Sequence, residues 1–91
     1  MQLVSFDLHD VRDEQDFYRQ FAEKFGLHGF GNNLDALWDV LTGEVSLPLR
    51  IMLRHLPQHP AEAGLRRIVT VMQEAESETA GAFSVRTSQP L

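Results

Sequence analysis

Three short segments in which apolar residues fall at every second position are separated by long segments in which they fall at helical spacing. The alternating segments are residues 2–8, 48–54 and 82–86, and this alternation is typical of half-buried β-strands. Two helical patterns lie between the first two strands, and one lies between the last two. Strands joined by such long connections run parallel, because each new strand starts again at the same end of the sheet. The sequence therefore predicts an α/β fold, a small three-stranded parallel sheet covered by helices, in the order β-α-α-β-α-β.

The length and composition limit what else the chain can contain. Its 91 residues predict a single domain over 1–91, and a hydrophobic fraction of 43% is that of a globular chain. There is no cysteine, so neither a disulfide framework nor a thiolate metal site can form. The first residues lack the basic and apolar regions of a leader peptide, and no stretch approaches the ~20 apolar residues of a membrane span. We therefore expect a cytoplasmic protein without membrane contact. We also expect the free protein to be a monomer.

The helical segment at residues 32–43 carries the most informative pattern. Its leucines recur at helical spacing, so one broad arc of the helix is apolar and should face the core. Either Asn32 or Asn33 can accept hydrogen bonds from the free N–H groups of the first turn. Gly43 can take the left-handed conformation that often ends a helix. The pattern thus predicts an amphipathic helix with a cap at each end.

The other side of this helix is acidic. Trp38 falls at the edge of the apolar arc, and Thr42, Asp35 and Asp39 follow it round the helix. Asp39 is expected in the last turn, where unpaired carbonyl groups make a carboxylate unfavourable. Folding alone would not select it there. Two interpretations follow, an ordinary solvated acidic face or a surface that binds a partner.

The run NLDALWD at residues 33–39, followed by Leu41, Thr42 and Gly43, resembles the second helix of the barstar family, and Gly31 stands in the family's loop before it. Members of that family are intracellular inhibitors of the barnase type of secreted ribonuclease. The resemblance extends, more thinly, over nearly the whole chain. It implies the same α/β fold, and an acidic helix and preceding loop that bind the cationic active site of a basic secreted ribonuclease.

The resemblance also implies which residues bind the partner. Asp35 and Asp39 would imitate the phosphates of RNA, and Glu74 would match a contact glutamate on the long helix predicted over residues 61–78. The implied partner-binding residues are Phe30, Gly31, Asn33, Asp35, Trp38, Asp39, Thr42, Gly43, Glu44, Glu74 and Glu78. From composition alone, the glutamates of the last helix are a solvated charged face.

The sequence departs from the family pattern in two places. Gly26, Gly29 and Gly31 suit a loop whose backbone approaches a partner, but Gly29 and Phe30 stand where the family offers tyrosines. Glu44 stands where the family's reference member has an indole. These departures leave an alternative open, in which the chain is a barstar-like immunity or interaction module for a partner that is not a ribonuclease.

The sequence offers little for catalysis or cofactor binding. Asp35 and Asp39 form a carboxylate pair, but an exposed pair of this kind lacks the burial that tunes catalytic acids and bases. His55 and His59 are four residues apart, and Pro57 between them argues against the helix that would place them on one face. The net charge of -5 opposes direct binding to nucleic acid and favours a basic partner. We expect no enzyme activity, no cofactor and no metal site.

Overall fold

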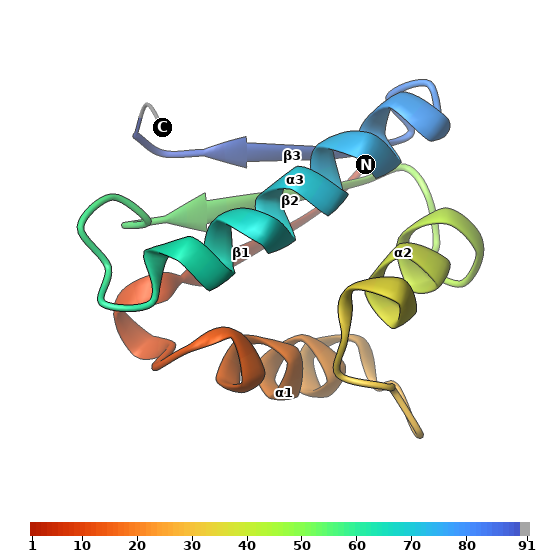
Figure 1. The fold of residues 1–91 in the computed structure, drawn as a ribbon. Helices are drawn as coiled ribbons and strands as arrows, with labels where there is room; N and C mark the ends of the chain where they lie inside the picture. The colour runs from red at the N-terminus through yellow and green to blue at the C-terminus, as the bar shows by residue number, and fades with distance from the viewer. Residues whose placement is uncertain (90–91) are drawn as a thin grey trace.

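A computed structural model, which describes residues 1–89, shows three helices packed on one face of a three-stranded parallel sheet (Figure 1). This arrangement confirms the predicted α/β fold and its order. Within the described residues, no helix is long and apolar enough to cross a bilayer. The elements are β1 (Gln2–Asp7), a short 3-10 helix η1 (Leu8–Asp10), α1 (Glu14–Phe25), α2 (Leu34–Gly43), β2 (Leu49–Arg54), α3 (Glu62–Glu78) and β3 (Phe83–Thr87).

The strand order β1-β2-β3 explains why the helices share one face of the sheet. β2 lies in the centre, with Leu49 opposite Gln2 on one side and Phe83 on the other. Because both crossovers move in the same direction across the sheet and such crossovers are right-handed, they place their helices on the same side. The covered face is apolar and buried, as at Phe6 and Ile51, whereas residues of the opposite face such as Leu3 remain exposed.

Helix α1 supplies a ridge of phenylalanine rings, Phe17, Phe21 and Phe25, to this core. Asp13 caps the helix by accepting a hydrogen bond from the Asp16 N–H at 2.8 Å, and Gly26, at φ 62°, ends it. The rings of Phe17 and Phe21 are fully buried, and their centroids lie 4.9 and 6.3 Å from that of Phe6 on β1. Helix α1 is thus fixed to the sheet by aromatic packing.

The segment between β2 and α3 contains no helix, as Pro57 indicates, and His59 holds this loop in place. The Nε2 atom of His59 lies 3.0 Å from the Leu8 carbonyl oxygen and 2.7 Å from that of Val11, while its Nδ1 accepts a hydrogen bond from the Ala61 N–H. Because Nδ1 accepts, the proton of the neutral ring is on Nε2, which donates to the two carbonyls. His59 therefore ties together segments that are about fifty residues apart.

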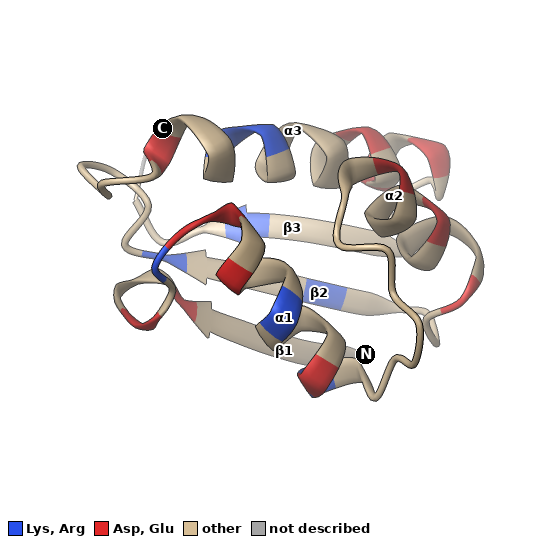
Figure 2. Cartoon of the chain, turned by 60° about the horizontal axis from the view of Figure 1, so that its bottom comes forward, with Lys and Arg blue, Asp and Glu red and all other residues tan. Residues whose placement is uncertain are grey.

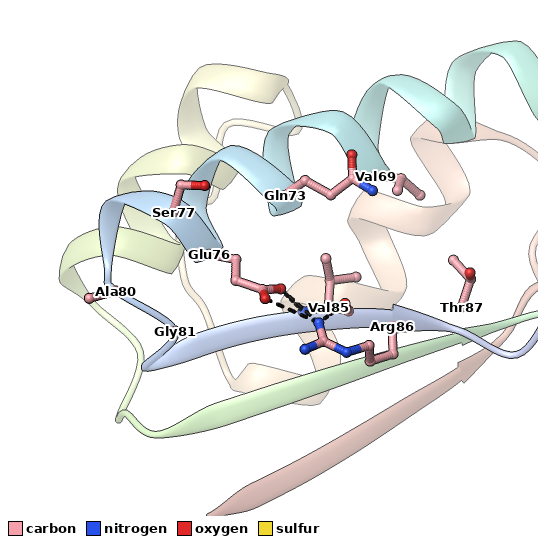
Figure 3. A pocket seen from close by; sticks show the side chains of 9 residues that line it. All are labelled: Val69, Gln73, Glu76, Ser77, Ala80, Gly81, Val85, Arg86 and Thr87. Atoms are coloured by element: carbon pink, nitrogen blue, oxygen red, sulfur yellow. Dashed lines mark hydrogen bonds and ion pairs between the residues drawn. The ribbon is translucent and has the colours of Figure 1, made fainter.

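The outer edge of β3 is closed by side chains from α3 and from Thr79, the residue that follows it. Figure 3 shows Glu76 reaching from α3 toward β3, across a cleft of about 610 Å³. Its Oε1 accepts hydrogen bonds from the Val85 N–H at 3.0 Å and from Arg86 Nη1 at 2.9 Å. Thr79 Oγ1 accepts one from the Phe83 N–H. These contacts occupy backbone groups that an edge strand would otherwise offer to another chain.

Glu76 is expected to make the stability of the protein fall in acid. The Val85 N–H, and then Arg86, hold the pKa of Glu76 below its usual value of 4.5. A depressed folded-state pKa contributes stability that is present above about pH 4.5 and is lost as the pH falls through the lower, folded value. Glu76→Gln should therefore reduce the slope of unfolding free energy against pH below pH ~4.5, measured by urea unfolding. Glu74→Gln is the control, because Glu74 is exposed, and an equal loss of slope in both variants would contradict this assignment.

Candidate functional site

Asn33 joins the loop before α2 to the first turn of the helix. Its Oδ1 accepts a hydrogen bond from the Ala36 N–H at 2.7 Å, and its Nδ2 donates one to the Gly31 carbonyl oxygen at 3.1 Å. Asn33 is therefore the N-cap, and of the two asparagines that could serve, the structure selects it. Asn32 takes a left-handed conformation instead, at φ 53°.

The C-terminal end of α2 differs from the sequence prediction. Gly43 was expected to be left-handed, but it belongs to the helix, and the following Glu44 is right-handed at φ -119° and ψ -30°. The N–H groups of Glu44 and Val45 both donate to the Val40 carbonyl oxygen, so the chain leaves the helix without a left-handed residue. The predicted cap is therefore wrong. As a result Asp39 lies just before the last turn, where the unfavourable field of the helix end is weaker.

Helix α2 buries its leucine side and exposes its carboxylates. Leu37 and Leu41 are buried, whereas Asp35 and Asp39 are exposed, one helical turn apart. None of the ion pairs within residues 1–89 involves either aspartate. No lysine or arginine occurs in the sequence between Lys24 and Arg50, so the charge of α2 is not neutralised by its own segment. Two free carboxylates are thus carried on a rigid helix.

Trp38 and Thr42 lie beside these carboxylates, as the helical spacing predicts, but both are partly committed to the fold. The Trp38 side chain is half-buried and packs on the edge of the core. Thr42 Oγ1 donates a hydrogen bond to the Trp38 carbonyl oxygen at 2.8 Å. This bond uses the hydroxyl's only proton, so Thr42 can offer a partner an acceptor but not a donor.

The loop between α1 and α2, residues 26–33, is anchored by Phe30. The Phe30 ring is half-buried, with its centroid 6.0 Å from that of Tyr18 and 5.5 Å from that of Phe21. Gln15 on α1 donates a hydrogen bond to the Asn32 carbonyl oxygen. The sequence suggested Phe30 only as a partner contact, and its second role, fixing the loop on α1, depends on contacts distant in the sequence.

Glycine at position 31 allows this loop to lie close to α2. A Cβ atom at Gly31 would lie 3.2 Å from both the Ala36 Cβ and the Asn33 Nδ2, closer than most side chains tolerate. Beside it, a cleft of about 160 Å³ separates the loop from the helix, and Asp39 and Glu44 contribute to its walls. The cleft is thus small and carries negative charge, which suits a basic side chain of a partner.

The C-terminal half of α3 adds further acidic residues. Figure 2 shows acidic residues on α2, on the loop after it and at the end of α3, all on one side of the molecule, where α2 and α3 lie next to each other. Glu74 and Glu78 are exposed. We call Asp35, Asp39, Glu44, Glu74 and Glu78 the acidic face. Glu76, which lies between Glu74 and Glu78 in the sequence, is not part of the acidic face, because it is bonded to β3.

Comparison with known proteins agrees with this architecture. The sequence model of the family described as "Barstar (barnase inhibitor)" matches residues 1–87. A relative from Bacillus subtilis (strain 168), named "Putative ribonuclease inhibitor YrdF", is 33% identical over 87 residues, which cover 93% of this chain and 82% of that protein. The matched residues include the loop before α2, α2 itself and the end of α3. The chain therefore belongs to the barstar family.

Proposed function

We propose that this protein inhibits a secreted ribonuclease of the barnase type by placing its acidic face in the cationic active site of that enzyme. The observation that carries the proposal is the pair of exposed carboxylates, Asp35 and Asp39, which no cation of residues 1–89 pairs with. The family described as barnase inhibitors, and a relative named as a ribonuclease inhibitor, support the same role. Members of this family are inhibitors, so the chain is not an enzyme.

The proposed mechanism is electrostatic imitation of the substrate. A ribonuclease active site holds arginine and lysine side chains that bind the phosphates of RNA. Arginine binds a carboxylate through two parallel hydrogen bonds, much as it binds a phosphate. Asp35 and Asp39, one turn apart on α2, can each receive such a cation. The protein then occupies the site without offering a bond that the enzyme can cleave.

Preorganisation of the loop and helix supports tight binding. Asn33 fixes Gly31 relative to α2, and Phe30 rests on α1. A surface that is already ordered loses less conformational entropy when it binds. Within this proposal, Gly31 lets the partner approach the backbone, Trp38 packs beside the carboxylates, and the remaining carboxylates engage basic residues at the rim.

The inhibitor would act in the cytoplasm, as a monomer, where it protects the cell that makes the ribonuclease. Its net charge of -5 matches a basic partner and opposes direct binding to RNA. The carboxylates of the acidic face would therefore meet the enzyme rather than its substrate.

The test is a titration of a barnase-type ribonuclease with the purified protein while RNA cleavage is followed. Cleavage should stop once the protein equals the enzyme in concentration, and the protein alone should leave RNA intact. If the rate is unchanged at high micromolar protein, a barnase-type enzyme is not the target. The alternative is then a partner that is not a ribonuclease, an interpretation favoured by Glu44 in the cleft wall and by the loop's lack of tyrosines. Capture of such a partner from lysate would identify it.

Association with the ribonuclease is expected to be sensitive to salt. The screening length falls from ~10 Å at 0.1 M to ~3 Å at 1 M salt, so exposed carboxylates lose most of their attraction for a distant cationic site. The association rate should therefore fall more than the dissociation rate rises, as stopped-flow mixing would show. An association rate that is equal at both salt concentrations would mean that apolar contacts near Trp38 and Phe30 drive the encounter.

A further inference from the structure

Two histidines and an aspartate meet at the other end of the sheet from the acidic face. Asp7 is the last residue of β1, His9 lies in η1, and His55 directly follows β2. Parallel strands end at the same edge of a sheet, which brings these positions together. One ligand atom from each of the three side chains lies within 4.8 Å of the other two. The cluster combines two imidazoles with one carboxylate.

The three side chains are close to one another but not locked together. The His9 and His55 rings stack with their centroids 4.0 Å apart and their planes at 10°. Asp7 Oδ1 accepts a hydrogen bond from the His9 backbone N–H and lies 3.9 Å from His9 Nδ1. The side chains of His9 and Asp7 are 68% and 39% exposed. An ion can therefore reach them, and the rings can turn without disturbing the core.

His9, His55 and His59 line one cleft of about 510 Å³, but His59 cannot join the cluster as a ligand. Both of its ring nitrogens are occupied by backbone groups, at Leu8, Val11 and Ala61. For His55, by contrast, no hydrogen bond of a ring nitrogen is found among residues 1–89; its ring meets that of His9 instead. Of the pair His55 and His59, four residues apart in the sequence, only His55 therefore has ring nitrogens that no backbone group of residues 1–89 occupies.

We propose that Asp7, His9 and His55 bind a divalent transition-metal ion, Zn²⁺ being the best match. Imidazole and carboxylate together suit zinc and its neighbours, whereas calcium and magnesium take oxygen ligands. Zinc lies ~2.0–2.2 Å from such ligands, so the three ligand atoms would have to converge from their present separations. Three protein ligands leave a fourth position for water. The bound ion would fasten η1 to the loop after β2, away from the acidic face.

The test is calorimetric titration of Zn²⁺ into the untagged protein after treatment with a chelator. One Zn²⁺ should bind per chain with micromolar affinity and raise the melting temperature. Asp7→Asn, which keeps an acceptor for the His9 N–H, and His55→Asn, which suits the left-handed φ of 68°, should each weaken binding at least ~10-fold. His9→Gln should do the same.

His28→Asn is the matched control, because it removes an exposed histidine in the loop 26–33, outside the cluster. It should leave zinc affinity unchanged. Circular dichroism without metal shows which variants are folded. The proposal is overturned if the wild-type protein shows no saturable binding below about 1 mM Zn²⁺. It is also overturned if His28→Asn weakens binding as much as the cluster variants do, or if folded cluster variants bind as well as the wild type.

Discussion

Replacing Asp39 with alanine is expected to weaken binding to the ribonuclease by about 2 to 5 kcal/mol or more, a range that measurements on the barnase–barstar pair helped to establish. The change would leave a desolvated cation of the enzyme without its partner. In the free protein Asp39 is exposed, and it takes part in no ion pair within residues 1–89. It also lies toward the C-terminal end of α2, and alanine favours helix. Stability should therefore stay the same or rise by up to about 1 kcal/mol.

A substitution that weakens binding while folding stability stays the same or rises identifies a recognition residue. Urea unfolding and complex affinity should be measured on the same preparations. Asp10→Ala is the matched control, because it removes the same charge from an exposed position outside the acidic face, and its affinity should stay close to that of the wild type. If Asp39→Ala unfolds more easily while its affinity per folded molecule is unchanged, Asp39 is a structural residue and the recognition surface lies elsewhere.

Phe21→Ala is expected to lower the free energy of unfolding by about 3 to 5 kcal/mol. The Phe21 side chain is fully buried, and its ring centroid lies 4.8 Å from that of Phe25, 6.1 Å from that of Phe17 and 5.5 Å from that of Phe30. Its removal leaves a cavity at the centre of the aromatic ridge. Because Phe30 rests on this ring, the loop before α2 should also become more mobile, and affinity per folded molecule should fall.

Leu53→Ala is the control that separates the two expected effects of Phe21→Ala, the loss of folding stability and the loss of affinity. Leu53 is buried on β2, outside the aromatic cluster that holds the loop, so its truncation should cost about 2 to 5 kcal/mol of folding. Its affinity per folded molecule should be retained. If Phe21→Ala retains that affinity as well, the order of the loop does not depend on Phe30 and its support. A folding cost below about 1 kcal/mol would contradict the packing itself.

The fold could be predicted because its signals are local and repeated. Alternation in residues 2–8 and 48–54 identified strands, and the long connections between strands required a parallel sheet. The N-terminal cap of α2 was also readable, since Asn33 is a residue type that accepts hydrogen bonds from a first turn. The end of α2 was not. A glycine permits a left-handed cap without requiring one, and the bonds to Val40 settled the geometry.

Contacts between segments that are distant in the sequence could not be predicted from it. Glu76 has the same local pattern as its exposed neighbours, and only the position of β3 makes it a bonded residue. His59 and the pair His9 and His55 likewise depend on how η1 meets the loop after β2. Phe30 offered one hint, because an aromatic residue near a phenylalanine-rich helix has a ready packing partner. Local periodicity carries no such pairing information.

Competition with a nucleotide tests most directly whether the acidic face replaces RNA in the active site. The affinity of the protein for a barnase-type ribonuclease should be measured at increasing concentrations of a mononucleotide that occupies that site. If the carboxylates of α2 bind the cations that hold phosphate, the nucleotide and the protein compete for the same site. Once the nucleotide concentration exceeds the dissociation constant of the nucleotide for the enzyme, the apparent dissociation constant of the protein will rise in proportion to the nucleotide concentration. An apparent dissociation constant that does not change with nucleotide would show that the protein binds outside the active site, and would contradict the proposed mechanism.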